Sequence, residues 1–181
     1  DRAYTAFIMQ WAESGVMRKV TLEELRAHGK WTELPHHGVI RDSKTTPVRP
    51  VIEGNAHDKG CHSSNDFLDI GVNVLPLIPE IITDMRLKKY FIMSDISKAF
   101  VQIELAEEDQ WLLVIRWPSH KLPDGTWHHD FYCFTRLPWG ISPAPFVLNA
   151  GTRCLFRAEG EENPVLTPIT VSYTHLTLPT I

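Results

Sequence analysis

One aspartate stands where a buried strand is expected to end. The apolar run at residues 90–94 predicts a short strand, and Asp95 follows it directly. A carboxylate at the exposed end of such a strand can bind a hard divalent cation, because Mg²⁺ prefers oxygen ligands and keeps several of its waters. An isolated aspartate in this position more often caps a turn or a helix. The residue alone leaves both interpretations open.

Two arginines lie on a predicted hairpin. Strands are expected at residues 37–41 and 48–51, joined by a polar turn at 42–47. If this hairpin is symmetric about Thr45, Arg41 and Arg49 face each other and point to the same side. Adjacent guanidinium groups are costly unless an anion lies between them, and a triphosphate suits their donors. Arg41 is explained equally well as a solvated surface charge.

Two aromatic residues and one glycine form a further set of candidate site residues. Phe100 follows Asp95 by five positions, and by itself it is most simply a core residue on a strand after Asp95. Gly140 follows Trp139 where the chain turns into a helix expected to begin near Pro145. Glycine there allows the backbone to approach a base or a sugar closely. A simple turn glycine explains Gly140 nearly as well.

The elements that must position these residues alternate irregularly between helix and strand. Near the N-terminus, the pattern predicts a helical stripe ended by Gly15, and a capping box from Thr21 to Glu24 that opens a short helix through Leu25. A loop follows at 54–66, and helical spacing over 67–86 is interrupted by Pro76 and Pro79. Two more strands are expected at 111–117 and 127–134, joined by a turn at 124–125. Interleaved elements without a regular βαβ rhythm indicate an α+β fold.

The composition is that of a globular protein. Of the 181 residues, 43% are hydrophobic and 22% are charged, and no run of about 18 apolar residues predicts a membrane span. The net charge of −4 does not exclude a nucleic-acid enzyme, because polymerases use local basic strips beside acidic faces. Cys61, Cys133 and Cys154 are odd in number and irregularly spaced, which predicts reduced thiols in an intracellular protein.

Several histidines cluster with cysteines along the chain. The groups are His36 with His37, then His57, Cys61 and His62, and finally His128, His129 and Cys133. None has the paired spacing typical of a zinc site, and loop or turn histidines are the simpler interpretation. A zinc-dependent hydrolase built on these histidines is the alternative enzyme class.

Several segments, in order, resemble the reverse transcriptases of Bel-Pao-type long-terminal-repeat retrotransposons. Residues 94–103 (SDISKAFVQI) are similar to the first catalytic motif, and residues 136–146 (RLPWGISPAPF) resemble the motif that contacts template and nucleotide. Upstream, residues 35–41 (PHHGVIR), 48–51 (VRPV) and 64–66 (SND) resemble the fingers. The resemblance covers roughly residues 31–159. It implies the fingers and part of the palm of a right-hand polymerase.

The resemblance also implies a role for each site residue. The Asp95 carboxylate would be catalytic and would bridge two Mg²⁺ or Mn²⁺ ions, with the backbone carbonyl of Ile96 completing one coordination shell. Phe100 would be the steric gate that excludes a 2′-hydroxyl. The nucleotide-binding residues implied are Arg41, Arg49, Ala99, Phe100, Trp139 and Gly140. Trp139 departs from the phenylalanine or glutamine that is usual in the family.

The same resemblance implies boundaries and partners. The expected segments are an N-terminal helical part (1–33), fingers (34–85 and 106–136), palm (86–105 and 137–170) and a tail (171–181, VSYTHLTLPTI) that looks like a translated sequencing adapter. The partners would be an RNA or DNA template–primer, deoxynucleoside triphosphates and other domains of a retrotransposon polyprotein. The setting would be an intracellular, cytoplasmic virus-like particle without a membrane.

The chain itself is expected to be inactive, because it stops before the aspartate pair of the family. A non-catalytic nucleic-acid-binding fragment or a decayed element is therefore the alternative to a living enzyme.

Overall fold

The structure is a computed structural model that describes residues 2–40, 48–74, 77–90 and 95–162. The chain divides into two compact units. Unit 1 comprises residues 1–69 and 98–144, and unit 2 comprises residues 70–97 and 145–181. Helices and small antiparallel sheets are mixed without parallel pairing of whole strands, so the fold is α+β, as the sequence predicts.

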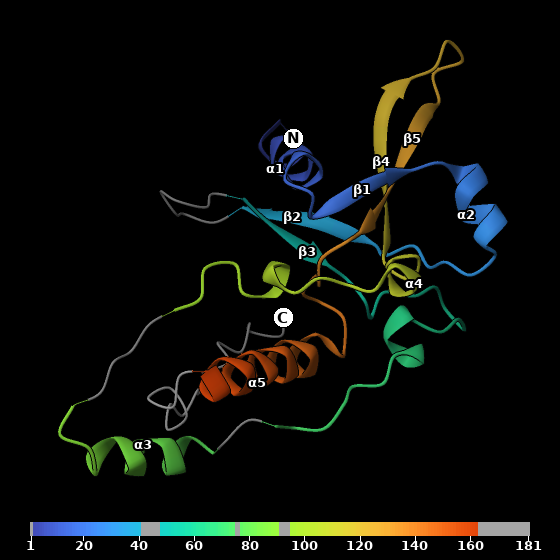
Figure 1. Cartoon of the computed structure of the whole chain (residues 1–181). Helices are drawn as coiled ribbons and strands as arrows, with labels where there is room; N and C mark the ends of the chain where they lie inside the picture. The colour runs from blue at the N-terminus through green and yellow to red at the C-terminus, as the bar shows by residue number, and fades with distance from the viewer. Residues whose placement is uncertain (1, 41–47, 75–76, 91–94, 163–181) are drawn as a thin grey trace. The chain divides into compact units, whose positions relative to one another are not determined.

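Unit 1 contains both sheets (Figure 1). Its elements are α1 (Arg2–Glu13), β1 (Met17–Val20), α2 (Leu22–His28), β2 (His36–Ile40), β3 (Val48–Ile52), the 3₁₀ turn η1 (Ser64–Phe67), the 3₁₀ turn η2 (Phe100–Gln102), α4 (Glu107–Gln110), β4 (Val114–Lys121) and β5 (Trp127–Phe134). Unit 2 contains α3 (Ile78–Arg86) and all but the first residue of α5 (Ala144–Glu162).

The larger sheet has the strand order β1-β5-β4, with both pairs antiparallel. The β4–β5 hairpin confirms the prediction of two strands around a turn at 124–125, although β4 begins at Val114 rather than at residue 111. The three residues before it lie in a turn after α4, where the amide of Leu113 donates to Gln110 O. The four-residue strand β1 is too short to give a periodic signal, and the sequence does not predict it.

Apolar side chains of α1 and of the larger sheet form the core of unit 1. Ile8 and Trp11 are buried on the predicted helical stripe, which ends before Gly15 in a left-handed conformation at φ 74°. The Trp11 ring meets the buried Phe134 ring edge-on at 5.7 Å between centroids. Burying aromatic rings of this size removes much apolar surface from water and fixes α1 against β5.

The capping box predicted at Thr21 is confirmed. The amide of Glu24 donates to Thr21 Oγ1 at 3.1 Å, and the amide of Thr21 donates to the Glu24 carboxylate at 2.6 Å. These reciprocal bonds satisfy amides at the start of α2. The amide and the hydroxyl of Thr21 both donate to the Glu24 carboxylate and lower its pKa. The helix continues past Leu25 to His28 and is closed by Gly29 at φ 77°.

The smaller sheet is the β2–β3 hairpin, which confirms the predicted pair of strands. Its register joins Val39 to Arg49 and Ile40 to Val48, which centres the pairing on position 44. The prediction of symmetry about Thr45 is therefore wrong by one position, and Arg49 lies opposite Val39 rather than Arg41. Arg41 itself lies outside the described residues. The register is set by core packing of Val48 and Ile52, which a count from the turn does not include.

Helical spacing over 67–86 gives a helix only in its second half. α3 begins at Ile78 with Pro79 in its first turn, where a missing N–H costs nothing. Residues 68–74 are not helical, and within them a Cβ at Gly71 would collide with the Phe146 ring. In the same unit, Arg153 of α5 donates to the backbone carbonyl of Val74. Packing against α5 therefore overrides the weak helical periodicity in this segment.

α5 confirms the helix predicted near Pro145, and burial along it does not simply follow polarity. Leu148, Asn149 and Thr152 are buried, whereas Cys154 and Leu155 are exposed. The predicted strand at 90–94 falls largely outside the described residues, as does the tail at 171–181.

His36 lies in a network that fixes its neutral form. Tyr4 Oη donates to His36 Nδ1 at 2.7 Å, and His36 Nε2–H donates to Arg116 O at 3.2 Å. Its ring also stacks on Trp117, at 5.7 Å between centroids. Burial raises the pKa of Tyr4 to about 12 and lowers the pKa of His36, with the bond to Arg116 O partly opposing the second shift.

This network predicts acid sensitivity of unit 1. Because the pKa of His36 is lower in the folded state than its ordinary value of about 6.5, the unfolded chain binds more protons once the pH falls below that value. Stability present above about pH 6.5 should be lost as the pH falls further, by at most about 1.4 kcal/mol per pH unit for one proton. Urea unfolding of the wild type and of His36→Gln at about pH 7.5 and at about pH 5.5, roughly one unit on either side of that value, measures the difference. Equal losses in both proteins would contradict the prediction.

Candidate functional site

The proposed catalytic carboxylate lies in unit 2. Asp95 and Ile96 directly follow the undescribed residues 91–94, and both side chains are exposed. Among the residues that the structure describes, none forms a hydrogen bond or an ion pair with the Asp95 carboxylate. Within the described residues, the Asp95 oxygens therefore cap no turn.

The segment after Asp95 turns sharply before the predicted gate. Lys98 has φ 54°, and within the described residues no other non-glycine residue has a positive φ. Phe100 then begins η2, with the amide of Ile103 donating to Phe100 O at 3.0 Å. The strand expected after Asp95 is wrong, because Phe100 lies on a 3₁₀ turn; its side chain is half-buried, and that of Val101 is buried.

Arg49 is presented on the exposed side of β3. Its neighbours Val48 and Pro50 are buried, and strand alternation turns Arg49 to the opposite side, where it is exposed. No described carboxylate pairs with its guanidinium group. The five hydrogen-bond donors of this side chain are thus available to an anion.

Trp139 and Gly140 dock onto the same strand. Trp139 Nε1–H donates to Pro50 O at 3.0 Å, and its ring meets Trp11 edge-on at 5.1 Å between centroids. Gly140 has φ 92°, and a Cβ there would collide with the carbonyl oxygen of Ile52. The close approach predicted for Gly140 is therefore an approach to protein backbone. Gly140 remains exposed and Trp139 half-buried, and their contact with a nucleotide stays a prediction.

Asn65 connects this loop to the segment after β3. Its Oδ1 accepts from the amide of Ser142 at 2.8 Å, and its Nδ2 donates to Asn55 Oδ1 at 2.8 Å and to Gly140 O at 3.4 Å. The amide of Asn65 donates to Gly54 O at 2.9 Å. Gly54 is buried here, since a Cβ would lie 2.6 Å from Gly140 O. The sequence carries Asn65 within a fingers-like motif, but nothing in it indicates this joining role.

These contacts define a single structural feature of unit 1, the β3 junction. It comprises Pro50, Ile52, Gly54, Asn65, Trp139, Gly140 and Ser142. Three segments meet here. The last of them, with Trp139, Gly140 and Ser142, is hydrogen-bonded to partners that precede it by 75 to 89 residues in the sequence. Hydrogen bonds between side chains and backbone join these segments, and each contributes to holding the loop in place.

The predicted site residues are divided between the units. Asp95 and Ile96 belong to unit 2, whereas Arg49, Ala99, Phe100, Trp139 and Gly140 belong to unit 1. A cleft with Arg49 and Asp95 on facing walls joins residues of both units and stays a prediction. Arg49 pairs with Val39, and because Arg41 lies outside the described residues, the predicted approach of the two arginines stays a prediction.

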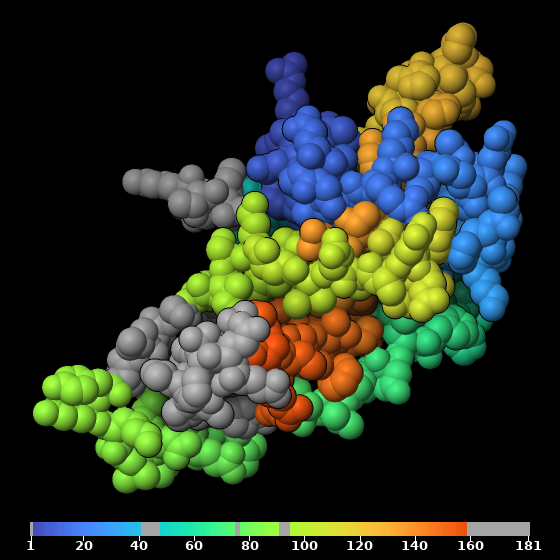
Figure 2. Space-filling view, viewed as in Figure 1, coloured from blue at the N-terminus to red at the C-terminus, as the bar shows by residue number. Residues whose placement is uncertain are grey.

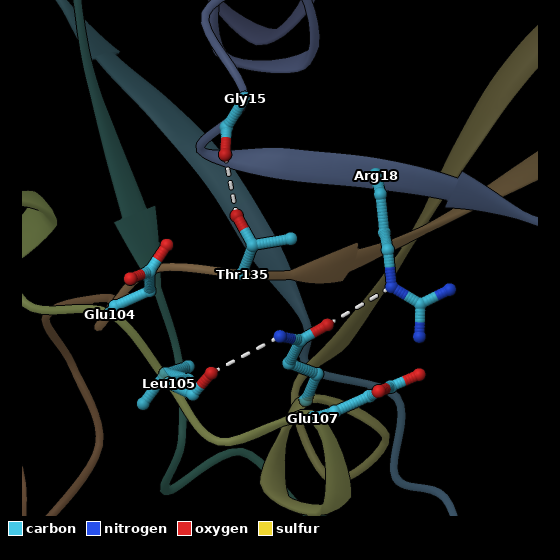
Figure 3. Close-up of a pocket in the computed structure, with 7 residues that line it drawn as sticks. Gly15, Arg18, Glu104, Leu105, Glu107 and Thr135 are labelled. Atoms are coloured by element: carbon cyan, nitrogen blue, oxygen red, sulfur yellow. Dashed lines mark hydrogen bonds between the residues drawn. The ribbon is translucent and has the colours of Figure 1, made fainter.

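A pocket of about 500 Å³ lies between β1 and α4 in unit 1 (Figure 3). Its lining is Gly15, Arg18, Glu104, Leu105, Glu107, Gln110 and Thr135. Arg18 Nε donates to Gln110 Oε1 at 3.0 Å, and its guanidinium carbon lies 4.5 Å from the centre of the Trp111 ring. None of the predicted site residues lines this pocket, and its acidic side chains do not favour a phosphate.

In the described residues, no group of three or more histidine, cysteine, aspartate or glutamate side chains is arranged to hold a metal ion. The three cysteines form no disulfide; Cys133 is buried, and Cys61 and Cys154 are exposed. No helix among the described residues is both long and apolar enough to cross a membrane.

No protein-family model matches the sequence, and no curated protein is significantly similar to it.

Proposed function

We propose that this chain is part of an RNA-directed DNA polymerase that copies retrotransposon RNA into DNA. The observation that supports this most strongly is the β3 junction. The hairpin strand of residues 48–51, the SND segment and the RLPWGIS segment each resemble a separate motif of reverse transcriptases, and hydrogen bonds join all three. Motifs that are distant in the sequence serve one site only if the fold brings them together. The α+β class is consistent with this proposal.

Asp95 is the proposed metal ligand. Its carboxylate is exposed and unpaired among the described residues, and the chain bends immediately after it, so the oxygens and the Ile96 carbonyl can reach a hard cation. Bound Mg²⁺ or Mn²⁺ would lower the barrier to attack by the primer 3′-oxygen and stabilise the leaving pyrophosphate. The structure describes no carboxylate cluster at this place, so substrate phosphates and further carboxylates of the complete enzyme would supply the remaining ligands.

The residues of unit 1 are proposed to hold the nucleotide. Arg49 would bind the triphosphate through its free donors, and the half-buried ring of Phe100 would lie beneath the sugar. Ala99 beside it would leave room for the nucleotide. Trp139 and Gly140 would form the wall of the site, held in place by the β3 junction rather than by the substrate.

The partners follow from the same proposal. They are a template–primer of RNA or DNA, deoxynucleoside triphosphates and neighbouring domains of a retrotransposon polyprotein, within a cytoplasmic virus-like particle.

Primer extension distinguishes the polymerase from a nucleic-acid-binding remnant. The complete reading frame should incorporate dTTP on poly(rA) primed with oligo(dT), and only with Mg²⁺ or Mn²⁺. The 181-residue chain alone should not, since its sequence contains no adjacent aspartate pair and one carboxylate supplies few of the ligands that two metal ions need. Incorporation by the short chain would contradict the metal assignment. Binding of template–primer without incorporation by the complete protein would favour the remnant.

A further inference from the structure

The β4–β5 hairpin extends beyond the core of unit 1 as an exposed arm. Every residue from 118 to 128 is exposed, and the yellow and orange end of the hairpin stands out as a separate lobe in Figure 2. None of these residues has a role in the proposed polymerase site. The arm nevertheless carries an ordered arrangement of side chains.

Two histidines form a stacked pair across this arm. The register places His120 directly opposite His128, with ring centroids 4.7 Å apart and the planes inclined by only 20°. Both side chains are exposed. Between Pro118 and His120 the pairing is interrupted by a bulge, which leaves Ser119 as the additional residue. A bulge redirects a side chain, and here it brings Ser119 Oγ between the two rings.

Ser119 organises both imidazole rings through one oxygen. Its Oγ lies 3.0 Å from His120 Nδ1, 3.0 Å from His128 Nδ1 and 3.2 Å from His128 O. A hydroxyl has one hydrogen and two lone pairs. All three contacts are satisfied when the hydroxyl donates to His128 O and accepts an N–H from each ring. In that arrangement both neutral rings carry their proton on Nδ1 and leave the Nε2 lone pair free.

We propose that His120 and His128 form a two-histidine site for a divalent transition-metal ion such as Zn²⁺. Neutral imidazole nitrogen is a preferred ligand of such ions, and a metal-bound histidine typically donates its other N–H to an oxygen that fixes the tautomer. Ser119 supplies that oxygen for both rings. Two Nε2 ligands at 2.0–2.1 Å from a tetrahedral ion lie roughly 3.3 Å apart. Both side chains are exposed, and their rings would turn out of the stacked arrangement so that the two Nε2 lone pairs, which lie in the ring planes, point at one ion.

The neighbouring groups leave the site open to water. The Asp130 carboxylate lies 3.8 Å from His128 Nδ1 but is already paired with Lys19 at 2.8 Å. Lys121 is held over the Trp127 ring at 5.5 Å from its centre. Two protein ligands and water make a site of moderate affinity, which would clamp the two strands of the arm together.

The two histidines that pair across the hairpin are not the group that neighbouring sequence positions suggest. Neighbouring positions suggest His128 with His129 and Cys133, but the Cys133 side chain is fully buried in the core, away from the exposed arm. The strand register, which the sequence does not specify, joins His128 to His120 instead.

Titration of the metal-free 181-residue chain with ZnCl₂ tests the proposal, by calorimetry and by ¹⁵N NMR of the histidine rings. One equivalent should bind, and the Nε2 resonances of His120 and His128 should shift. H120Q and H128Q should each lower the affinity at least about tenfold, whereas the matched variant H129Q on the same strand should leave it unchanged. Ser119→Ala should weaken binding by about 10- to 100-fold without abolishing it.

Two results would overturn the site. One is an equal loss of affinity in H129Q, and the other is a wild-type spectrum in which other histidine rings shift while these two do not. Far-UV circular dichroism of each variant verifies that the fold is retained, and the wild-type spectrum decides the question even where a variant unfolds.

Discussion

Replacing Asp95 with asparagine in the complete polymerase is expected to lower nucleotide incorporation by at least about 10³-fold, or about 4 kcal/mol of transition-state stabilisation. The amide keeps the size of the side chain but loses the negative charge that neutralises a metal ion and the second oxygen that binds it. Because Asp95 is exposed and unpaired among the described residues, the melting temperature should not change.

Asp84→Asn is the matched control, since Asp84 is another exposed aspartate of unit 2, on α3. It should retain wild-type activity. The two variants are compared by the initial rate of primer extension at saturating Mg²⁺, with thermal unfolding measured alongside. An Asp95→Asn enzyme that keeps more than a tenth of its activity would remove Asp95 from the catalytic centre.

Replacing Phe100 with valine should change sugar selection rather than stability. A steric gate discriminates by a clash between the ring and the 2′-hydroxyl, and its removal abolishes a repulsive contact. Ribonucleotide use should therefore rise relative to deoxyribonucleotide use by about 2–4 kcal/mol, or about 30- to 1000-fold. The half-buried position of Phe100 on the η2 turn makes a large loss of stability unexpected.

Phe7→Val separates this effect from ordinary packing. Phe7 is also half-buried and packs edge-on against Trp11 at 4.9 Å between centroids, but it belongs to α1. Its truncation should lower the melting temperature and leave the ratio of the two nucleotide efficiencies unchanged. A core role for Phe100 would give that same pattern, with a loss of up to about 3–5 kcal/mol for a fully buried ring. An unchanged ratio in Phe100→Val would thus contradict the gate.

Strong local signals predicted much of the fold. The capping box at Thr21, the hairpin around residues 124–125 and the start of α5 near Pro145 depend on neighbouring residues, and the structure contains all three. Tertiary packing decided the rest. The register that places Arg49 opposite Val39 depends on which side chains reach the core, and the chain before α3 follows the Phe146 ring instead of its own periodicity.

In the candidate site too, local sequence patterns predicted some residues and tertiary contacts decided others. A motif identifies Asp95, Phe100 and Gly140 as positions of interest, because each is tied to a short local pattern. Asn65 and Gly54 act through partners 75 or more residues away, and no spacing within their own segments predicts that contact. The interpretation of Gly140 changed for this reason, since its close neighbour is the Ile52 backbone.

The central claim is that Asp95 and Arg49 act on one bound nucleotide. The most direct test is a crystal structure of the complete enzyme with template–primer, Mg²⁺ and a non-hydrolysable deoxynucleoside triphosphate. The decisive quantities are the distances from the Asp95 carboxylate to the metal and from the Arg49 guanidinium to the phosphates. We expect the first to be about 2.0–2.1 Å and the second to be about 2.7–3.0 Å. An Arg49 side chain that points away from the triphosphate, or a metal bound without Asp95, would contradict the account.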